Sequence, residues 1–451
     1  MSQPYHTKSD DAWSNDVLAL LPADLDASAR EYGAFTRVRA FADASQLLRG
    51  LLAYACSQTS LRAVAAWGVL VDVADIAPSS WLERLRSSGP WLQALVTQVL
   101  QQPRPRWLSQ LVRGRVLLVD ASCLRWQGGS GNDQRIHLAY DLLACQFAQV
   151  IATDGKGAEH LRHFAFQPYD LAIFDGGYSY RDRFALLQDQ GADGIGRIYP
   201  PTFPLETATG QRLDVRAWLD SHGAGQRSRL AYYSYDGQRR AVRLLATRLY
   251  EPHRQEAGHR ARQKARKRQR PLGEVASYYA DWMLVVTTLL DEQSWPDAAI
   301  WRLYRARWQI ELVFKGLKQF LELDDLRWRT LASAQAVVWA RLLLWVLHEP
   351  LRRQLGRTLQ GLAQPQPTTY EGQRPQAEAV VSEWSCCDLL LSTLIQAIRG
   401  SWSLARLEQC LPRLVRFFVS HPRQDREHQA TEIRAWLTGQ RLTPARPLAS
   451  H

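Results

Sequence analysis

The chain has 451 residues, of which 46% are hydrophobic and 22% charged, and its formal net charge is +12. Two or three domains with buried cores fit this length, and the composition excludes a disordered chain. We find no apolar run near the ~20 residues that span a bilayer and no signal-peptide core, so we expect a cytoplasmic protein without a membrane partner. The positive charge favours a polyanionic partner such as nucleic acid, although an ordinary basic protein is the alternative.

Cysteine and histidine usage gives little indication of a transition-metal site. The chain contains no C-x-x-C pair and no zinc-like spacing, which favours reduced, mostly buried thiols. His160 and His163 are three residues apart and could bind a metal, although such pairs on a surface are more often coincidental. The cysteines are Cys56, Cys123, Cys145, Cys386, Cys387 and Cys410.

Residues 1–110 are expected to form a helical region. From Asp24 to Gln102 the apolar residues recur at helical spacing, and Ser60 is placed to cap a helix rich in small residues. Beyond a loop, Ser79 or Ser80 is expected to cap a second helix over 81–87. Two short helices joined by a turn predict a DNA-binding unit of the helix-turn-helix type. A small helical bundle without DNA contact is the alternative.

Residues 111–345 predict an α/β catalytic domain, which follows a boundary at 103–106. Three strands come first, and helix and strand then alternate, which is the order of a ribonuclease H-like core with a mixed five-stranded sheet flanked by helices. A turn is expected at 128–133. The predicted strands are Arg115–Asp120, Arg135–Asp141, Ala144–Thr153, Asp170–Asp175 and Gly194–Tyr199, and the predicted helices are Ala158–Phe164 and Ser179–Gln190.

Residues 200–291 predict a β-rich insertion in the catalytic sheet. Strands are expected at Gln211–Leu219, Arg229–Tyr235, Ala241–Tyr250 and Trp282–Leu289. Between the last two lies a basic segment, 254–270, which favours a surface that follows DNA phosphates over a merely solvated helix. Its candidate DNA-binding residues are Arg262, Lys264, Arg266, Lys267 and Arg268.

The segment Trp301–Leu321 predicts one amphipathic helix. At roughly 100° per residue, Tyr304, Arg307, Glu311 and Lys318 fall within an arc of about 60°, beside an apolar arc of about 120°. Helix-spaced ion pairs on a solvated face would give the same pattern. Residues 346–451 predict a further helical region, interrupted by a Gln/Pro-rich loop at 364–375.

Three acids have the sequence context of a catalytic metal site. Asp120 and Asp175 each end an apolar segment at a turn, and Glu311 comes from the amphipathic helix. Phosphoryl transfer on DNA is well served by two divalent ions roughly 3.5–4 Å apart, which such carboxylates can hold. We expect the first and fourth strands to be neighbours, so that Asp120 and Asp175 could share an ion.

The order Tyr, two residues, Arg, three residues, Glu, six residues, Lys resembles the Y-R-E-K pattern of the IS4-type DDE transposases of bacterial insertion sequences. All four positions match, at Tyr304, Arg307, Glu311 and Lys318. The segments 119–122 and 174–178 are similar to the first and second catalytic blocks of that family. Gly176 stands where many relatives have arginine, so the role of that arginine is absent or supplied elsewhere. The similarity extends from about residue 25 to about 350.

This resemblance implies roles for individual residues. Asp120, Asp175 and Glu311 would be ligands of two Mg²⁺ (or Mn²⁺) ions, while Tyr304, Arg307 and Lys318 would contact DNA phosphates. Trp282 would stack on a flipped base, although packing in the core is the alternative for this tryptophan.

The resemblance also implies the reaction and the partners. The reaction would be metal-dependent cleavage at element ends followed by strand transfer into target DNA. The partners would be double-stranded DNA, both terminal inverted repeats and target, and a second copy of the chain in a homodimer, associated with the nucleoid. Two other readings are a domesticated or inactive relative that only binds DNA, and a ribonuclease H-like nuclease without strand transfer.

Overall fold

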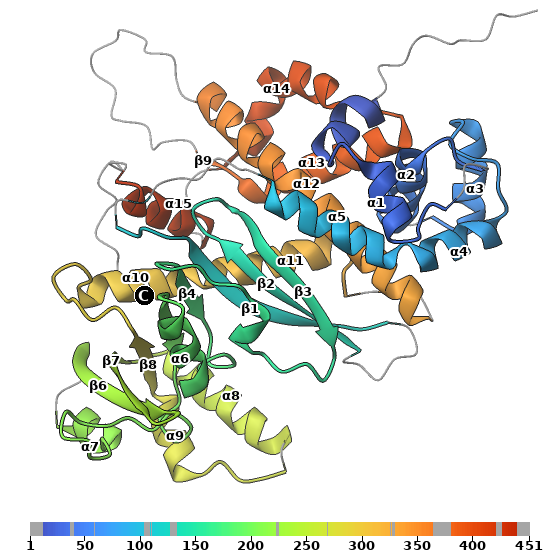
Figure 1. Cartoon of the computed structure of the whole chain (residues 1–451). Coiled ribbons are helices and arrows are strands. Elements are labelled where there is room, and N and C mark those ends of the chain that lie inside the picture. Colours follow the sequence, from blue (N-terminus) through green and yellow to red (C-terminus); the bar gives the residue numbers. More distant parts are fainter. Residues whose placement is uncertain are drawn as a thin grey trace, which may run out of the picture.

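One eight-stranded sheet, of order β3-β2-β1-β4-β5-β8-β7-β6, organises the chain in the computed structural model (Figure 1). Its strands are β1 Val116–Leu124, β2 Gln134–Asp141, β3 Gln146–Asp154, β4 Leu171–Phe174, β5 Asp193–Arg197, β6 Arg227–Tyr235, β7 Gln238–Arg248 and β8 Trp282–Thr287. The structure describes residues 12–36, 40–57, 59–102, 109, 111–126, 133–221, 225–267, 269–324, 326, 330–363, 380–420 and 426–439. Arg268, the boundary at 103–106, most of the turn at 128–133 and the loop at 364–375 lie outside these ranges.

The first five strands confirm the predicted strand order. β1 pairs antiparallel with β2 and parallel with β4, and β4 pairs parallel with β5. The predicted helix after β4 is confirmed as α6, Arg181–Asp189. The helix predicted at Ala158–Phe164 is wrong, because only a single 3₁₀ turn, Leu161–His163, forms there. β1 also runs past Asp120 to Leu124, so this acid lies within a strand and not at its end.

The strands of the predicted insertion, residues 200–291, extend the sheet formed by β1 to β5. β8 pairs antiparallel with β5 and also with β7, so the predicted five-stranded sheet continues into eight strands without interruption. The strand predicted at Gln211–Leu219 is wrong, because this segment contains α7, Val215–Asp220, capped by the Asp214 side chain. The helices α8, His253–Lys267, and α9, Glu274–Ala280, complete the insertion, and no residue of α8 is buried. Figure 1 shows α8 at the periphery of the molecule.

The predicted helix Trp301–Leu321 is two helices, α10 Asp297–Ala306 and α11 Trp308–Leu321. At the break, Arg307 N–H donates to the Tyr304 carbonyl and Ile310 N–H to the Arg307 carbonyl, both at 3.2 Å and three residues apart. A tight turn therefore separates them. Before α10, Arg243 of β7 donates to the Trp295 carbonyl at 2.5 Å, which ties the insertion to this helix pair.

The helices at the two ends of the chain pack together around α12, Leu331–Ala363. The N-terminal helices are α1 Leu25–Glu31, α2 Ala44–Ala55, α3 Leu61–Leu70, α4 Pro78–Ser87 and α5 Gly89–Gln101, after two short turns at Trp13–Val17 and Leu18–Leu20. The C-terminal elements are α13 Glu383–Arg399, α14 Leu404–Phe418, α15 Arg426–Leu437 and the short strands β9 Val380–Val381 and β10 Val419–Ser420. Figure 1 shows the blue and orange helices side by side.

Specific contacts hold this helical layer. The buried Arg49 of α2 donates to the Ile398 carbonyl at 2.8 Å, and Asp16 accepts from the Leu404 N–H at 2.6 Å. α12 is long and apolar enough to cross a membrane, but 83% of its most apolar window is buried inside the protein. The other elements of the fold therefore cover its apolar surface.

The N-terminal helices meet at Trp81. The predicted cap at Ser60 is confirmed, because its hydroxyl accepts a hydrogen bond from the Ala63 N–H of α3 at 3.2 Å. The cap predicted at Ser79 or Ser80 is wrong, because α4 already begins at Pro78. A Cβ on Gly50 would lie 2.1 Å from the Trp81 ring. α2 and α4 therefore approach so closely that only glycine fits.

Gly50→Ala is expected to lower the free energy of unfolding by about 1–3 kcal/mol through overpacking against Trp81. Gly356→Ala is the matched control, because nothing lies within 4 Å of a Cβ on this α12 glycine. The control is expected to raise stability by roughly 0.5–1 kcal/mol through helix propensity. Urea unfolding of the two variants measures both changes in the free energy of unfolding. A similar increase in stability in both variants would contradict the packing argument.

Candidate active site

Strand pairing places Asp120 and Asp175 side by side. The last pair in the parallel register of β1 and β4 is Val119 with Phe174, so the two acids are the next residues along neighbouring strands about 4.8 Å apart. Side chains alternate along a strand, so both acids share the face of Leu118 and Ile173. That face packs against α10 and α11. The expected neighbourhood of the two acids therefore follows from the sheet register.

Asp120 is a partly buried carboxylate in an acidic environment. Its Oδ1 accepts a hydrogen bond from the Ala121 N–H at 2.8 Å. Burial raises the pKa of Asp120 to about 7, and the neighbouring Asp175 and Glu159 carboxylates act in the same direction. The Ala121 N–H and the Arg307 guanidinium oppose the rise. A nearby cation would stabilise the ionised form of such a carboxylate. The carboxylates around Asp120 therefore fit a divalent metal ion.

Asp175 is oriented by the turn that follows β4. Its Oδ1 accepts from the Gly177 N–H at 2.7 Å, and its carbonyl accepts from Ser179 Oγ at 3.0 Å. The buried Tyr178 next to this turn contacts His137 Nδ1 through its hydroxyl at 3.0 Å. The Gly177 N–H thus orients the carboxylate, and Ser179 holds the backbone of the same residue.

His137 of β2 links Tyr178 and Thr153 in a buried hydrogen-bond network. Its Nε2 lies 2.9 Å from Thr153 Oγ1, and the ring is fully buried between β1 and β3. Burial lowers the pKa of His137 to about 4, helped by His163 and Arg135. The imidazole is therefore neutral at physiological pH and positions Tyr178 without adding charge to the site.

Glu311 lies near these acids but is paired with a cation. Arg307 Nη2 approaches Glu311 Oε1 at 2.8 Å, and the Arg307 side chain is only 12% exposed. Burial would lower the pKa of Arg307, but Tyr304, Glu311, Asp175 and Asp120 outweigh it and raise the pKa. The Arg307 guanidinium therefore interacts with all three acids. The ion pair between Arg307 and Glu311, which the sequence offered as the alternative explanation of the helix pattern, is also present.

The three acids do not converge on one point in this structure. Within the described ranges no group of three His, Cys, Asp or Glu side chains could hold a metal ion together. Asp120 and Glu311 instead line one open hollow of about 530 Å³, with Lys315, Lys318 and Asp324. The structure thus places Asp120 and Asp175 side by side, and Glu311 lines the same hollow as Asp120.

Two residues predicted to contact DNA are buried. Tyr304 is 8% exposed and belongs to the hydrophobic core that includes the apolar residues of α10 and α11. Burial raises its pKa, so the hydroxyl stays protonated. Trp282 is 6% exposed, with the Arg227 guanidinium 5.2 Å from its ring centre. Base stacking on Trp282 would require Arg227 to move first.

The predicted basic segment forms α8 and is exposed to solvent. Two of its arginines pair with acids, Arg254 with Glu251 and Asp281, and Arg260 with Glu256. Five described cations of the segment remain, all of them exposed: Arg262, Lys264, Arg266 and Lys267 of α8, and Arg270 after it. No carboxylate of the described part of the chain lies within 4 Å of any of these five.

Glu159 and Lys315 were not predicted from the sequence. Lys315 lies on α11 between Glu311 and Lys318 and lines the same hollow, which its helical spacing could have indicated. Glu159 follows β3 in an irregular loop, 3.7 Å from Arg135 Nη1. Burial and the Asp175 carboxylate raise its pKa. No local pattern marks this residue.

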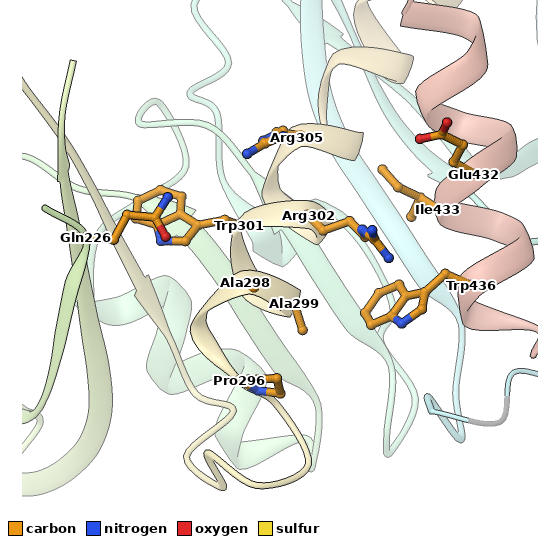
Figure 2. Close-up of a pocket in the computed structure, with 10 residues that line it drawn as sticks. All are labelled: Gln226, Pro296, Ala298, Ala299, Trp301, Arg302, Arg305, Glu432, Ile433 and Trp436. Atoms are coloured by element: carbon orange, nitrogen blue, oxygen red, sulfur yellow. The ribbon is translucent and has the colours of Figure 1, made fainter. Parts of the chain in front are cut away.

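A second hollow, of about 350 Å³, lies on α10 away from the acids. Figure 2 shows Gln226 and Trp301 at one end and Arg302 and Trp436 at the other. The Arg302 guanidinium lies 5.3 Å from the Trp436 ring centre, which helps to join α15 to α10. None of Asp120, Asp175 and Glu311 lines this hollow, so it is distinct from the acidic site.

Comparison with known proteins identifies the family of the chain. Residues 113–347 match the model of the transposase DDE domain, a span that contains all three acids. The chain is 34% identical over 344 residues to InsL of the insertion sequence element IS186A of Escherichia coli strain K12, covering 74% of this chain and 92% of that protein. It is also 34% identical over 345 residues to the transposase of element IS421 of Escherichia coli, with the same coverage. The chain therefore belongs to the DDE transposases of IS4-type insertion sequences.

Proposed function

We propose that Asp120, Asp175 and Glu311 hold two Mg²⁺ ions at which this transposase cleaves element ends and transfers strands. The observation that carries the proposal is the adjacent placement of Asp120 and Asp175, with Glu311 lining the hollow of Asp120. When bound, such ions activate the attacking oxygen and stabilise the leaving oxygen. The strand order β3-β2-β1-β4-β5 supports a ribonuclease H-like core for this site.

The chain's own cations bind and orient the DNA strand in this proposal. Lys318 and Lys315 line the open hollow and can neutralise phosphates that enter it. Arg307 neutralises the charge that three carboxylates would otherwise accumulate. A phosphate that competes for its guanidinium releases Glu311 from the 2.8 Å ion pair. DNA entry thereby makes the third acid available.

The other proposed partners are the terminal inverted repeats, target DNA and a second copy of the chain, with the protein on the nucleoid. The net charge of +12 and the exposed cations of α8 support DNA binding. The helix pair α3–α4 supports end recognition by the N-terminal region. Joining two element ends requires two active sites, which supports a dimer in the DNA complex.

Incubation of the protein with labelled end DNA, a target plasmid and Mg²⁺ tests the function. We expect cleaved ends whose 3′ hydroxyls become joined to the plasmid, and no product when EDTA replaces Mg²⁺. Nicks without joining would favour a nuclease that lacks strand transfer. Binding without nicks would favour an inactive, domesticated relative, and either result would overturn the proposal.

Replacing Arg262, Lys264, Arg266 and Lys267 of α8 by glutamine is expected to weaken DNA binding uniformly across sequences. Each lost phosphate contact reduces the salt dependence by about 0.9 in the log–log slope, so up to roughly 3–4 in total. Fluorescence anisotropy against salt concentration measures the slope. The control is Arg254→Gln on the same helix, whose guanidinium already pairs with Glu251 and Asp281. An unchanged slope in the fourfold variant would remove α8 from the DNA interface.

A further inference from the structure

Gly177 lies beside two carboxylates at the end of β4. A Cβ built on Gly177 would lie 2.0 Å from Glu159 Oε2 and 3.1 Å from Asp175 Oδ1. These two oxygens are therefore separated by no more than the sum of those distances. A side chain at residue 177 would fill the space that Glu159 occupies. Glycine at this position thus permits a fourth acid to approach the catalytic pair.

Among the residues that the structure describes, Arg135 is the cation that pairs with the Glu159 carboxylate, and this pair is a weak one. Its ion pair with Arg135 is 3.7 Å long, beyond the usual hydrogen-bond distance. The Arg135 guanidinium is directed elsewhere, because Nη1 donates to the Gly157 carbonyl at 2.8 Å and Nη2 to Cys123 Sγ at 3.5 Å. The Glu159 side chain is 32% exposed, so its carboxylate remains accessible. Two such carboxylates repel each other unless a cation lies between them.

We propose that Glu159 is a further ligand, directly or through a bound water, of the divalent ion held by Asp175. This inference rests on the proposed function, since it presupposes an ion at Asp175. Glu311 is occupied by Arg307 in the absence of DNA, so Asp120 and Asp175 alone provide few oxygens for a hard cation that prefers six. Glu159, whose carboxylate lies beside Asp175 at Gly177, supplies the missing carboxylate. The ion can then bind before DNA releases Glu311.

Calorimetric titration of the EDTA-treated, DNA-free protein with Mn²⁺ tests this role. We expect Glu159→Gln to weaken Mn²⁺ binding by about 10-fold, the lower range for loss of a group that supports a metal. Glu83→Gln, at an exposed site on α4, is the control and should bind Mn²⁺ like the wild type. The Tm of metal-free Glu159→Gln should equal or exceed that of the wild type, because repulsion with Asp175 is removed.

Wild-type affinity in Glu159→Gln would overturn the inference and leave the proposed function intact. A lower metal-free Tm with unchanged affinity would also overturn it, because Glu159 would then serve only as a structural partner of Arg135. Failure of the wild type itself to bind Mn²⁺ would instead count against the proposed function. The two failures are therefore distinguishable in one set of titrations.

A double-mutant cycle gives a second, steric test. Gly177→Ala should weaken Mn²⁺ binding in the wild-type background, because its Cβ displaces the Glu159 carboxylate. In a Glu159→Ala background the same substitution should have a much smaller effect, since the Cβ enters vacated space. Equal losses in both backgrounds would show that residue 177 acts on Asp175 alone, and Glu159 would then have no part in ion binding.

Discussion

Asp175→Asn is expected to reduce strand cleavage at element ends by roughly 1,000-fold or more, because loss of a metal-bound charge removes several kcal/mol of transition-state stabilisation. The fold should persist. The amide oxygen can still accept the Gly177 N–H hydrogen bond that now orients the carboxylate at 2.7 Å. Binding of end DNA should persist as well, since the exposed cations of α8 are unchanged.

A single-turnover nicking assay with Mg²⁺ measures this effect, alongside the Tm in EDTA and a gel-shift titration. Asp189→Asn is the matched control, because this α6 acid is 58% exposed and pairs only with Arg240 at 2.7 Å among the described residues. The control should cleave at the wild-type rate. Cleavage by Asp175→Asn within tenfold of the wild type would contradict the assignment of the acid pair.

Asp120→Asn is expected to stabilise the metal-free protein while abolishing its activity. The folded pKa of Asp120, about 7, lies above its unfolded value near 3.9, so the folded state holds the proton more tightly. Stability therefore falls as pH rises from about 4 to about 7 and is constant above that range. The gain from asparagine should be negligible at pH 4 and reach up to about 4 kcal/mol at pH 8.

Urea unfolding in EDTA at pH 4 and pH 8 tests the expected gain in stability. Added Mg²⁺ should narrow the difference, because the wild-type carboxylate then gains a counter-charge. Asp291→Asn is the opposite control. The Ser294 hydroxyl and the Gln293 N–H lower the pKa of Asp291, so its loss should bring no gain at either pH. A destabilised Asp120→Asn protein at pH 8 would contradict burial as the cause of the raised pKa.

The sequence was informative where local chemistry decides the structure. Apolar segments followed by Gly-rich turns marked β4 and therefore Asp175, and the strand order followed from the alternation of elements. Ser60 was recognisable as a cap because capping needs only its own hydroxyl and an amide three residues on. The spacing from Tyr304 to Lys318 identified the family without any tertiary information.

The sequence was less informative where tertiary contacts decide. No proline or glycine marks the break at Arg307, so the helix pair could not be distinguished from one helix, and the burial of Tyr304 was missed. Glu159 reaches the site only because residue 177, distant from it in the chain, lacks a side chain. The segment 211–219 contains enough apolar residues for a strand, but the Asp214 cap starts a helix.

The continuity of the eight-stranded sheet has a mechanical consequence. The Ile195–Thr287 pairing joins β8 to β5, and the Phe174–Gly196 pairing joins β5 to β4 directly before Asp175. The strands β7 and β8, which flank α8 in the sequence, are therefore part of the same hydrogen-bonded sheet as β4. In the proposed DNA complex, this continuous sheet would keep the strands that flank α8 at a fixed distance from the proposed site of cleavage.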